Sequence, residues 1–393
     1  MFKLPRAVWL LGWVSLATDA AGEAVYPLLP FFLTTVLGAG AVSLGIVEGA
    51  AEAANSFLKI LSGRMADRTR EKRRIVLLGY GVSSAARPFI ALATGWLHVF
   101  TVRVLDRVGK GVRSAPRDAM LASWATPTTR GKVYGFHQGM DNLGAVAGPV
   151  LATLFLLAYP GHYRTLFALT IVPGAIAVLL IFFVPEGERA DVASGSSRTI
   201  PTIPTGDPLP RSFNAFMIVL AIFALGNSTD AFLLLRLTQA SGSPRFVPLM
   251  WAGIHVVKAT VSVVGGSWSD RIGRRAVIAT GWVVYAVVYA GFAFSRGLPA
   301  LLAWFLVYGF YFGFAEGTEK ALVADLAPAS RRGTAFGIYN AVTGFGALAA
   351  SILFGAVWSW FGAPAAFGLG ASLALTATAL LFVAPAFAKA TAR

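Results

Sequence analysis

One short stretch reads Gly266-Ser267-Trp268-Ser269-Asp270-Arg271-Ile272-Gly273-Arg274-Arg275. About half a chain earlier a related stretch reads Gly63-Arg64-Met65-Ala66-Asp67-Arg68, followed by Lys72-Arg73-Arg74. Each stretch ends one long apolar segment and precedes another, so each is predicted to form a tight polar turn between two membrane helices. The glycine lets the helices approach closely, and the cations stay in water. Because the stretch occurs twice at the same place in the helix order, we expect a duplicated membrane protein.

The composition leads to the same class of protein. Of the 393 residues, 56% are hydrophobic and only 13% are charged, and a bilayer span needs a run of about 20 apolar residues. The formal net charge is +15, but few cations fall in loops on one side of the predicted membrane, namely Arg164, Arg245 and Arg296. This asymmetry predicts that both termini are cytoplasmic. We therefore attribute the basic charge to topology and lipid contact, and expect no nucleic-acid binding.

Twelve spans are predicted, at residues 7–37, 41–63, 75–96, 98–122, 132–158, 164–184, 212–240, 246–267, 276–295, 298–325, 333–360 and 363–386. The intervening stretch 185–211 is rich in Pro, Ser and Thr and is predicted to be a cytoplasmic linker. It separates an N-terminal six-helix bundle (1–184) from a C-terminal six-helix bundle (212–393).

The two predicted bundles share further sequence. Residues 130–138 (RGKVYGFHQ) match residues 332–340 (RGTAFGIYN), and the tripeptide at 18–20 (TDA) recurs at 229–231. We expect an all-α membrane protein with two pseudo-symmetric bundles and a site at the membrane midplane between them.

The two turn stretches resemble the loop signature of the major facilitator superfamily, of the bacterial inner-membrane type, and the twelve spans fit that family over the whole chain. The first copy lacks the second glycine and has Thr69 and Arg70 there. The resemblance implies that Asp270 faces the helix starting near Lys132 and that Asp67 faces the helix starting near Gly333. It further implies a bridge between Arg274 and Asp325. The gating residues that it implies are Gly63, Asp67, Arg68, Asp118, Gly266, Asp270, Arg271, Gly273, Arg274 and Asp325. Alternatively, these charges only set the topology.

Ionisable residues inside the spans are the main candidates for function, because a charge at the bilayer centre costs about 2.5–3.5 kcal/mol. In the fourth span Arg103, Arg107 and Lys110 share one face, and Asp106 lies beside them. The run at 107–111 (RVGKG) is similar to the fourth-helix motif of the family, which implies a role of Arg107 in proton coupling. Arg87 in the third span is expected to hold an acid of the second or fourth span.

Acids in the first two spans supply the counterpart. Asp19 and Glu23 lie one turn apart, and we expect one of them to pair with Arg107 or Arg103. A carboxylate that can separate from its cationic partner can load and release a proton, so Asp19, Glu23 and Arg107 are the predicted proton-coupling residues. A permanent structural ion pair is the alternative. The other predicted cavity residues are Arg103, Asp106, Lys110, Glu48, Glu52, Asn55, His137, Gln138, Asp141, Asn227, Asp230, His255, Lys258, Tyr311, Glu316, Tyr339 and Asn340.

No nucleotide-binding loop or nucleophile constellation is present, so we expect neither an enzyme nor a cofactor. The sequence predicts a monomeric secondary transporter that moves a small organic or anionic solute by alternating access, with proton-coupled efflux. The run at 144–149 (GAVAGP) resembles the fifth-helix signature of proton antiporters that export their substrates; helix packing alone would also explain it.

Two alternatives remain. Residues 106–111 and 114–118 resemble a bacterial branch of the superfamily assigned to nickel or iron export. A carrier of a metal ion or metal chelate could use Asp19, Glu23, His137, Asp141 and His255 as ligands. A non-transporting membrane receptor or scaffold is the second alternative, although it would have no use for buried charges.

Overall fold

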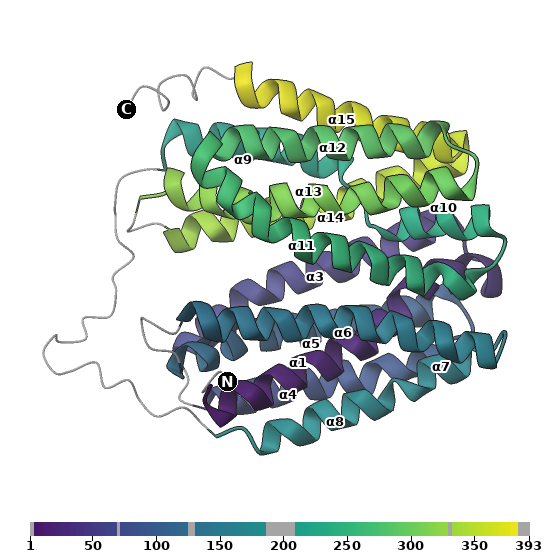
Figure 1. Ribbon diagram of the computed structural model, residues 1–393, viewed down its shortest axis with the longest axis vertical. Helices are drawn as coiled ribbons and strands as arrows, with labels where there is room; N and C mark the ends of the chain where they lie inside the picture. The colour runs from purple at the N-terminus through teal and green to yellow at the C-terminus, as the bar shows by residue number, and fades with distance from the viewer. Residues whose placement is uncertain (1–3, 69–70, 125–129, 186–208, 329–331, 384–393) are drawn as a thin grey trace, which may run out of the picture.

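The computed structural model describes residues 4–68, 71–124, 130–185, 209–328 and 332–383, and every regular element within these ranges is helical (Figure 1). The N-terminal half contains α1 (Arg6–Val25), η1 (Tyr26–Leu28), α2 (Leu29–Phe31), η2 (Phe32–Val36), α3 (Ala41–Arg68), α4 (Lys72–Ala86), η3 (Arg87–Leu92), α5 (Trp96–Ser123), α6 (Arg130–Ala158), α7 (Tyr163–Leu169) and α8 (Ile171–Phe182). The C-terminal half contains α9 (Arg211–Gly226), α10 (Ala231–Ser241), η4 (Pro244–Phe246), α11 (Val247–Ile272), α12 (Arg274–Phe294), α13 (Leu298–Leu326), α14 (Arg332–Phe361) and α15 (Ala363–Val383).

These helices fall at the twelve predicted positions, several of which are occupied by two or more consecutive elements. Eight of the described helical segments are long and apolar enough to cross a membrane. Four further long helices, α1, α3, α5 and α11, lie packed among them. Large apolar side chains such as Leu151, Phe294 and Trp360 are strongly exposed on the outside. Such exposure suits contact with lipid and would be a liability in water.

The turn stretches differ from the prediction. The first stretch continues α3 to Arg68, and the second continues α11 to Ile272, so most of each stretch is helical. The chain reverses at Gly273, whose φ of +93° is one that residues with a Cβ rarely adopt. The prediction of a tight turn over the whole stretch was therefore wrong, and the turn of the second copy is confined to its last glycine.

Two spans are interrupted near the centre of the bundle. Tyr26–Leu28 form a 3₁₀ turn at Pro27, where the ring removes a backbone donor. In the other half α9 ends at Gly226 and α10 begins at Ala231, which leaves Asp230 beside a non-helical segment. Irregular backbone at this depth is tolerated where protein surrounds it or where it lines a cavity. The repeated tripeptide thus lies in two different settings, since Asp19 is inside α1 whereas Asp230 directly precedes α10.

The two halves are in close contact through α3 and α14. A Cβ on Gly45 would lie 2.1 Å from the carbonyl oxygen of Ser351, and a Cβ on Gly355 would lie 2.6 Å from that of Ala41. Within the N-terminal half, α6 packs on α1 in the same way, because a Cβ on Gly148 would lie 2.2 Å from the carbonyl oxygen of Ala20. The predicted packing role of the small residues at 144–149 is thereby confirmed.

A buried aromatic core stiffens the C-terminal half. Trp282, Tyr285 and Tyr289 of α12 are fully buried. Phe223 of α9 stacks on Trp282 with ring centroids 4.4 Å apart, and Tyr308 of α13 lies against Tyr285. This core holds α9, α12 and α13 in fixed register, and those of its rings that face the other half form part of the site.

Figure 1 shows that α1 begins and α15 ends at the same end of the bundle, which we call the terminal end; the opposite end is the far end. Because α3 and α13 run toward the terminal end and α14 runs away from it, a residue's position along these helices gives its depth in the bundle.

Candidate functional site

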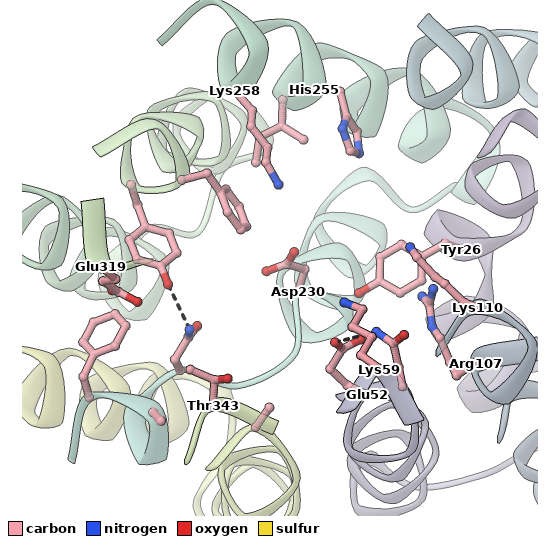
Figure 2. A pocket seen from close by; sticks show the side chains of 18 of the residues that line it. Tyr26, Glu52, Lys59, Arg107, Lys110, Asp230, His255, Lys258, Glu319 and Thr343 are labelled. Atoms are coloured by element: carbon pink, nitrogen blue, oxygen red, sulfur yellow. Dashed lines mark hydrogen bonds between the residues drawn. The ribbon is translucent and has the colours of Figure 1, made fainter. Parts of the chain in front are cut away.

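A cavity of about 440 Å³ lies between the two halves (Figure 2). Its walls come from α1, α3 and α5 on one side and from α9, α11, α13 and α14 on the other. Its lining residues are Glu23, Tyr26, Glu52, Asn55, Lys59, Arg107, Lys110, Leu220, Phe223, Ala224, Asn227, Asp230, Trp251, Ile254, His255, Lys258, Tyr311, Phe312, Glu319, Tyr339, Thr343 and Ala347. The volume is in the range of small-molecule sites.

The wall from the N-terminal half is almost entirely polar. Helical spacing places Glu52, Asn55 and Lys59 on one face of α3, and Arg107 and Lys110 on one face of α5. Asn55 donates a 3.0 Å hydrogen bond to the Glu52 carboxylate. Figure 2 shows the cations of this wall grouped on one side of the cavity.

The wall from the C-terminal half is aromatic with a few polar groups. Asn227 donates to the Tyr311 hydroxyl at 3.0 Å, and the amine of Lys258 lies 4.1 Å from the ring centroid of Phe312. Tyr308, behind the wall, donates a 2.8 Å hydrogen bond to Asp230. The carboxylate of Asp230 points into the cavity in Figure 2.

Glu319 is the second acid of this wall. It accepts hydrogen bonds from the indole nitrogen of Trp282 at 2.9 Å and from the Tyr339 hydroxyl at 3.1 Å. Its side chain is therefore anchored to the aromatic core as well as facing the cavity.

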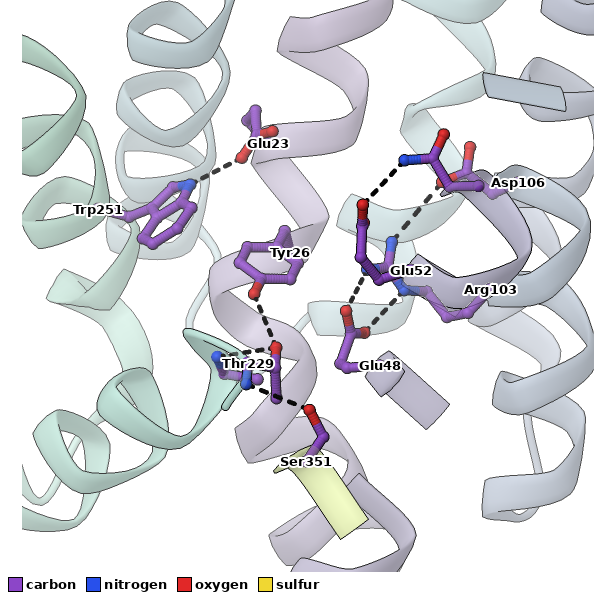
Figure 3. A network of polar contacts seen from close by, with 11 residues as sticks. Glu23, Tyr26, Glu48, Glu52, Arg103, Asp106, Thr229, Trp251 and Ser351 are labelled. Carbon is purple, nitrogen blue, oxygen red and sulfur yellow. Dashed lines mark hydrogen bonds and ion pairs between the residues drawn. The ribbon is translucent and has the colours of Figure 1, made fainter. Parts of the chain in front are cut away.

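Contacts between the halves lie on the side of the cavity toward the far end, and Figure 3 shows them. Trp251 of α11 donates a 2.7 Å hydrogen bond to Glu23 of α1, and Nε2 of His255 lies 3.9 Å from the same carboxylate. The hydroxyls of Tyr26 and Thr229 lie 3.3 Å apart. The contact between Tyr26 and Thr229 thus joins the two interrupted spans directly.

A buried charge network lies behind the N-terminal wall. Arg103 binds the Glu48 carboxylate through two hydrogen bonds of 2.8 and 2.6 Å, and its other terminal nitrogen lies 3.6 Å from Asp106. Arg87 donates to Asp106 at 2.8 Å, which confirms that Arg87 holds an acid of the fourth span. All four side chains are nearly inaccessible.

This network corrects two predictions. Glu48, Arg103 and Asp106 do not line the 440 Å³ cavity, because they satisfy one another inside the bundle. The expected ion pair of Asp19 or Glu23 with Arg103 or Arg107 is also absent among the described residues. Arg103 forms its ion pair with Glu48, and Glu23 accepts its hydrogen bond from Trp251.

Asp19 lies in a small side chamber of about 20 Å³ behind the cavity. The chamber shares Glu23, Tyr26, Arg107 and Lys110 with the wall of the cavity. Asp19 is therefore next to the cavity and does not line it.

The predicted residues of the fifth span also lie away from the cavity. Nδ1 of His137 is 3.5 Å from Asp141 one turn later, and Asp141 accepts a hydrogen bond from Ser15 of α1. Gln138 is exposed and lies 3.5 Å from Asn142. Asn340 is half-buried outside the lining.

The predicted metal ligands do not come together. His137 and Asp141 pair with each other on α6, whereas Glu23 and His255 meet between α1 and α11. Within the described ranges no cluster of three or more His, Asp or Glu side chains could hold a metal ion.

The predicted gating residues are described in part. Nε of Arg274 donates to Asp325 at 3.2 Å, as the family resemblance implied, and Asp118 accepts two hydrogen bonds from Arg117. The surroundings of Gly63 and Gly266 and the side chains of Asp67, Arg68, Asp270 and Arg271 lie outside the described part. The same holds for the predicted contacts of Asp67 and Asp270 with the helices starting near Gly333 and Lys132, and for the side chain of the predicted cavity residue Glu316.

Several cavity residues were not among the predicted ones: Lys59, Phe223, Trp251, Phe312, Glu319 and Thr343. For Lys59 a signal existed, since it lies two turns after Glu52 on the same face. For Trp251 and Phe223 there was none, because an aromatic residue in an apolar span is equally compatible with packing.

Comparison with known proteins identifies the family. The family model of the Major Facilitator Superfamily matches residues 9–256 and 215–393. The MFS-type transporter MJ1317 of Methanocaldococcus jannaschii is 32% identical over 363 residues, covering 91% of this chain and 89% of that protein. The multidrug resistance protein MdtH of Escherichia coli is 25% identical over 331 residues, covering 80% and 77%.

The fold is also that of solved transporters. A crystal structure of a mutant of the nucleoside transporter NupG superimposes with a TM-score of 0.81 at 15% identity, covering 96% of this chain and 99% of that one. With the helical bundle and its central cavity, these matches make the protein a multi-pass membrane transporter and not an enzyme. The chain belongs to the major facilitator superfamily.

Proposed function

We propose that this protein is a proton-coupled exporter of a small organic or anionic solute, working by alternating access in the cytoplasmic (inner) membrane with both termini in the cytoplasm. The observation that carries the proposal is the cavity between the halves, which has ionisable side chains on both walls. Buried charge is costly in a membrane and is retained where it serves transport. Both walls come from one chain, so a monomer is sufficient.

The structure corresponds in this proposal to the inward-facing state. The contacts of Glu23 with Trp251 and of Tyr26 with Thr229 join the halves toward the far end. The cavity extends from this layer toward the terminal end, where Lys59 and Glu319 lie. If the termini are cytoplasmic, the closed end is the external one.

Glu23 is the proposed centre of coupling. Its hydrogen bond to Trp251 joins α1 to α11, so opening of the far end must break that bond. A carboxylate without its donor in a poorly hydrated site is stabilised by taking up a proton. Proton binding at Glu23, with Asp19 in the adjoining chamber and Arg107 between the two spaces, would thereby be linked to the opening of the far end.

Two observations support export. The run at 144–149 resembles the exporter signature, and its glycines also serve the packing of α6 against α1. MdtH, at 25% identity, carries multidrug resistance in its name. A metal carrier is not proposed, since the described residues offer no ligand cluster, and a scaffold would not need a charged cavity.

Transport in proteoliposomes tests this function. A panel of radiolabelled organic solutes is offered with and without an imposed pH gradient, and uptake driven by the gradient is expected. Glu23→Gln should abolish the response to the gradient. Glu71→Gln, the same change at an exposed surface ion pair, should leave the response intact. Transport that is indifferent to the gradient, or a Glu23→Gln variant that still responds, would refute proton coupling at this residue.

A further inference from the structure

The acids that line the cavity are already hydrogen-bonded, each by an uncharged donor. Trp251 donates to Glu23, Asn55 to Glu52 and Tyr308 to Asp230. Glu319 accepts from Trp282 and Tyr339. Each of these carboxylates therefore already has a hydrogen-bond donor within the protein.

The cations of the N-terminal wall are in the opposite situation. The side chains of Lys59, Arg107 and Lys110 form no hydrogen bond and no ion pair with any other residue that the structure describes. The remaining arginines inside this half are all bonded: Arg87 and Arg103 to carboxylates, Arg113 to Ser83 and Arg117 to Asp118. Among the described cations inside this half, those without a protein acceptor are therefore the ones that face the cavity.

This contrast indicates what the cavity is built to receive. A cation held inside a membrane protein needs an acceptor, since removal from water is expensive. The described part of the protein supplies one to the four arginines behind or beside the cavity and none to the side chains of Lys59, Arg107 and Lys110. The missing acceptor must come from water when the cavity is empty, and from the ligand when it is occupied.

We propose that the substrate is an organic anion with a flat apolar body. Its carboxylate or phosphate group lies between Arg107, Lys110 and Lys59, where two helices present three donors. Its body lies against the aromatic wall of the other half, which is formed by Phe223, Trp251, Tyr311, Phe312 and Tyr339. Aromatic side chains of this kind favour planar partners, and an anion bound across both walls would bridge the halves.

Other ligand classes fit less well. A cation would lie beside three positive side chains that have no hydrogen-bonded acceptor among the described residues, and it would have to compete with the neutral donors for each carboxylate. A neutral solute would leave Lys59, Arg107 and Lys110 unpaired in a site from which it had displaced water, which costs free energy.

The inference rests on the proposed transport function but is tested by binding. Purified protein in lipid nanodiscs is titrated calorimetrically with trios that share one aromatic body and differ in charge: indole-3-acetate, indole-3-acetamide and tryptamine, with the corresponding phenyl and naphthyl compounds. At least one anion should bind, its amide should bind about tenfold more weakly, and its amine should show no binding. Lys110→Gln should weaken binding of the anion by about tenfold or more.

Two further variants separate charge from folding. Lys110→Arg keeps the positive charge and should retain most of the affinity. Lys320→Gln makes the same substitution at an exposed position outside the lining and should change nothing. The inference is overturned if no anion of the panel binds at millimolar concentration, if an amide or amine binds as tightly as its acid, or if Lys110→Gln binds like the unchanged protein.

Binding and transport can fail separately. An anion that binds with the expected dependence on Lys110 but is never carried across the membrane would support the ligand class and contradict the transporter proposal. If a cationic solute is carried across while no anion binds, the transporter proposal would be supported and the proposed ligand class would be contradicted.

Discussion

The indole nitrogen of Trp251 lies 2.7 Å from the Glu23 carboxylate, and this one hydrogen bond joins α11 of the C-terminal half to α1 of the N-terminal half. Ring contact between Tyr26 and Trp251, with centroids 5.0 Å apart, extends the same junction. The junction forms the far wall of the cavity, so its strength should set how readily the far end opens.

The first prediction concerns this bond. Trp251→Phe keeps an aromatic ring but removes the donor, and a hydrogen bond to a charged group is worth about 1.5–3 kcal/mol. The far end should therefore open more often. Ser228 is buried near this layer, and the chain has no cysteine of its own. The cysteine introduced by Ser228→Cys should therefore be alkylated faster when Trp251→Phe is also present. Trp360→Phe, at an exposed ring, is the control, and equal rates in both variants would show that the bond does not hold this end closed.

The second prediction concerns the buried network. Asp106→Asn leaves Arg87 and Arg103 without one carboxylate inside the membrane, and breaking a buried pair in this way costs about 3–5 kcal/mol. Asp118→Asn removes a carboxylate that is 52% exposed beside Arg117, and such pairs are worth about 1 kcal/mol or less. The thermal unfolding temperature measured in detergent should therefore fall much further for Asp106→Asn. Similar losses for the two variants would contradict a structural role of the network.

The third prediction concerns the contact of α3 with α14. A Cβ at position 45 would meet the Ser351 carbonyl oxygen, so Gly45→Ala must push the two helices apart. Overpacking of this kind costs about 1–3 kcal/mol, and the melting temperature of this state should drop. Gly81→Ala, in an open position inside α4, should instead be neutral or raise stability by up to about 1 kcal/mol. If Gly45→Ala melts no lower than Gly81→Ala, the close approach is not needed.

The fold could be predicted from sequence almost completely. Long apolar runs and the repeated stretch around Asp270 gave the spans and the two halves, because both follow from membrane thickness and gene-level duplication rather than from detailed packing. The exceptions were the turn itself, where only Gly273 leaves the helix, and the breaks at Tyr26–Leu28 and at residues 227–230, which were predicted to lie within continuous spans.

The site could be predicted only in part. Helical spacing placed Arg103 and Arg107 on one face of α5, yet Arg103 is occupied by Glu48 while Arg107 faces the cavity. Spacing fixes the face of one helix but not which neighbouring helix reaches it. The partner of Glu23 was missed for the same reason. Trp251 lies in the other half, and no spacing in the sequence indicates that its indole N–H reaches Glu23.

The most direct test of alternating access is a distance measurement across the far end. Cysteines introduced in place of Gly40 and Arg245, both exposed and on opposite halves, can carry spin labels without background in a chain that has no native cysteine. Pulsed electron–electron double resonance in nanodiscs should show a short distance between the labels that matches this structure and a second, longer distance. The fraction of molecules with the longer distance should change with pH and with bound aromatic anion. A single short distance under every condition in which the protein transports would contradict the account.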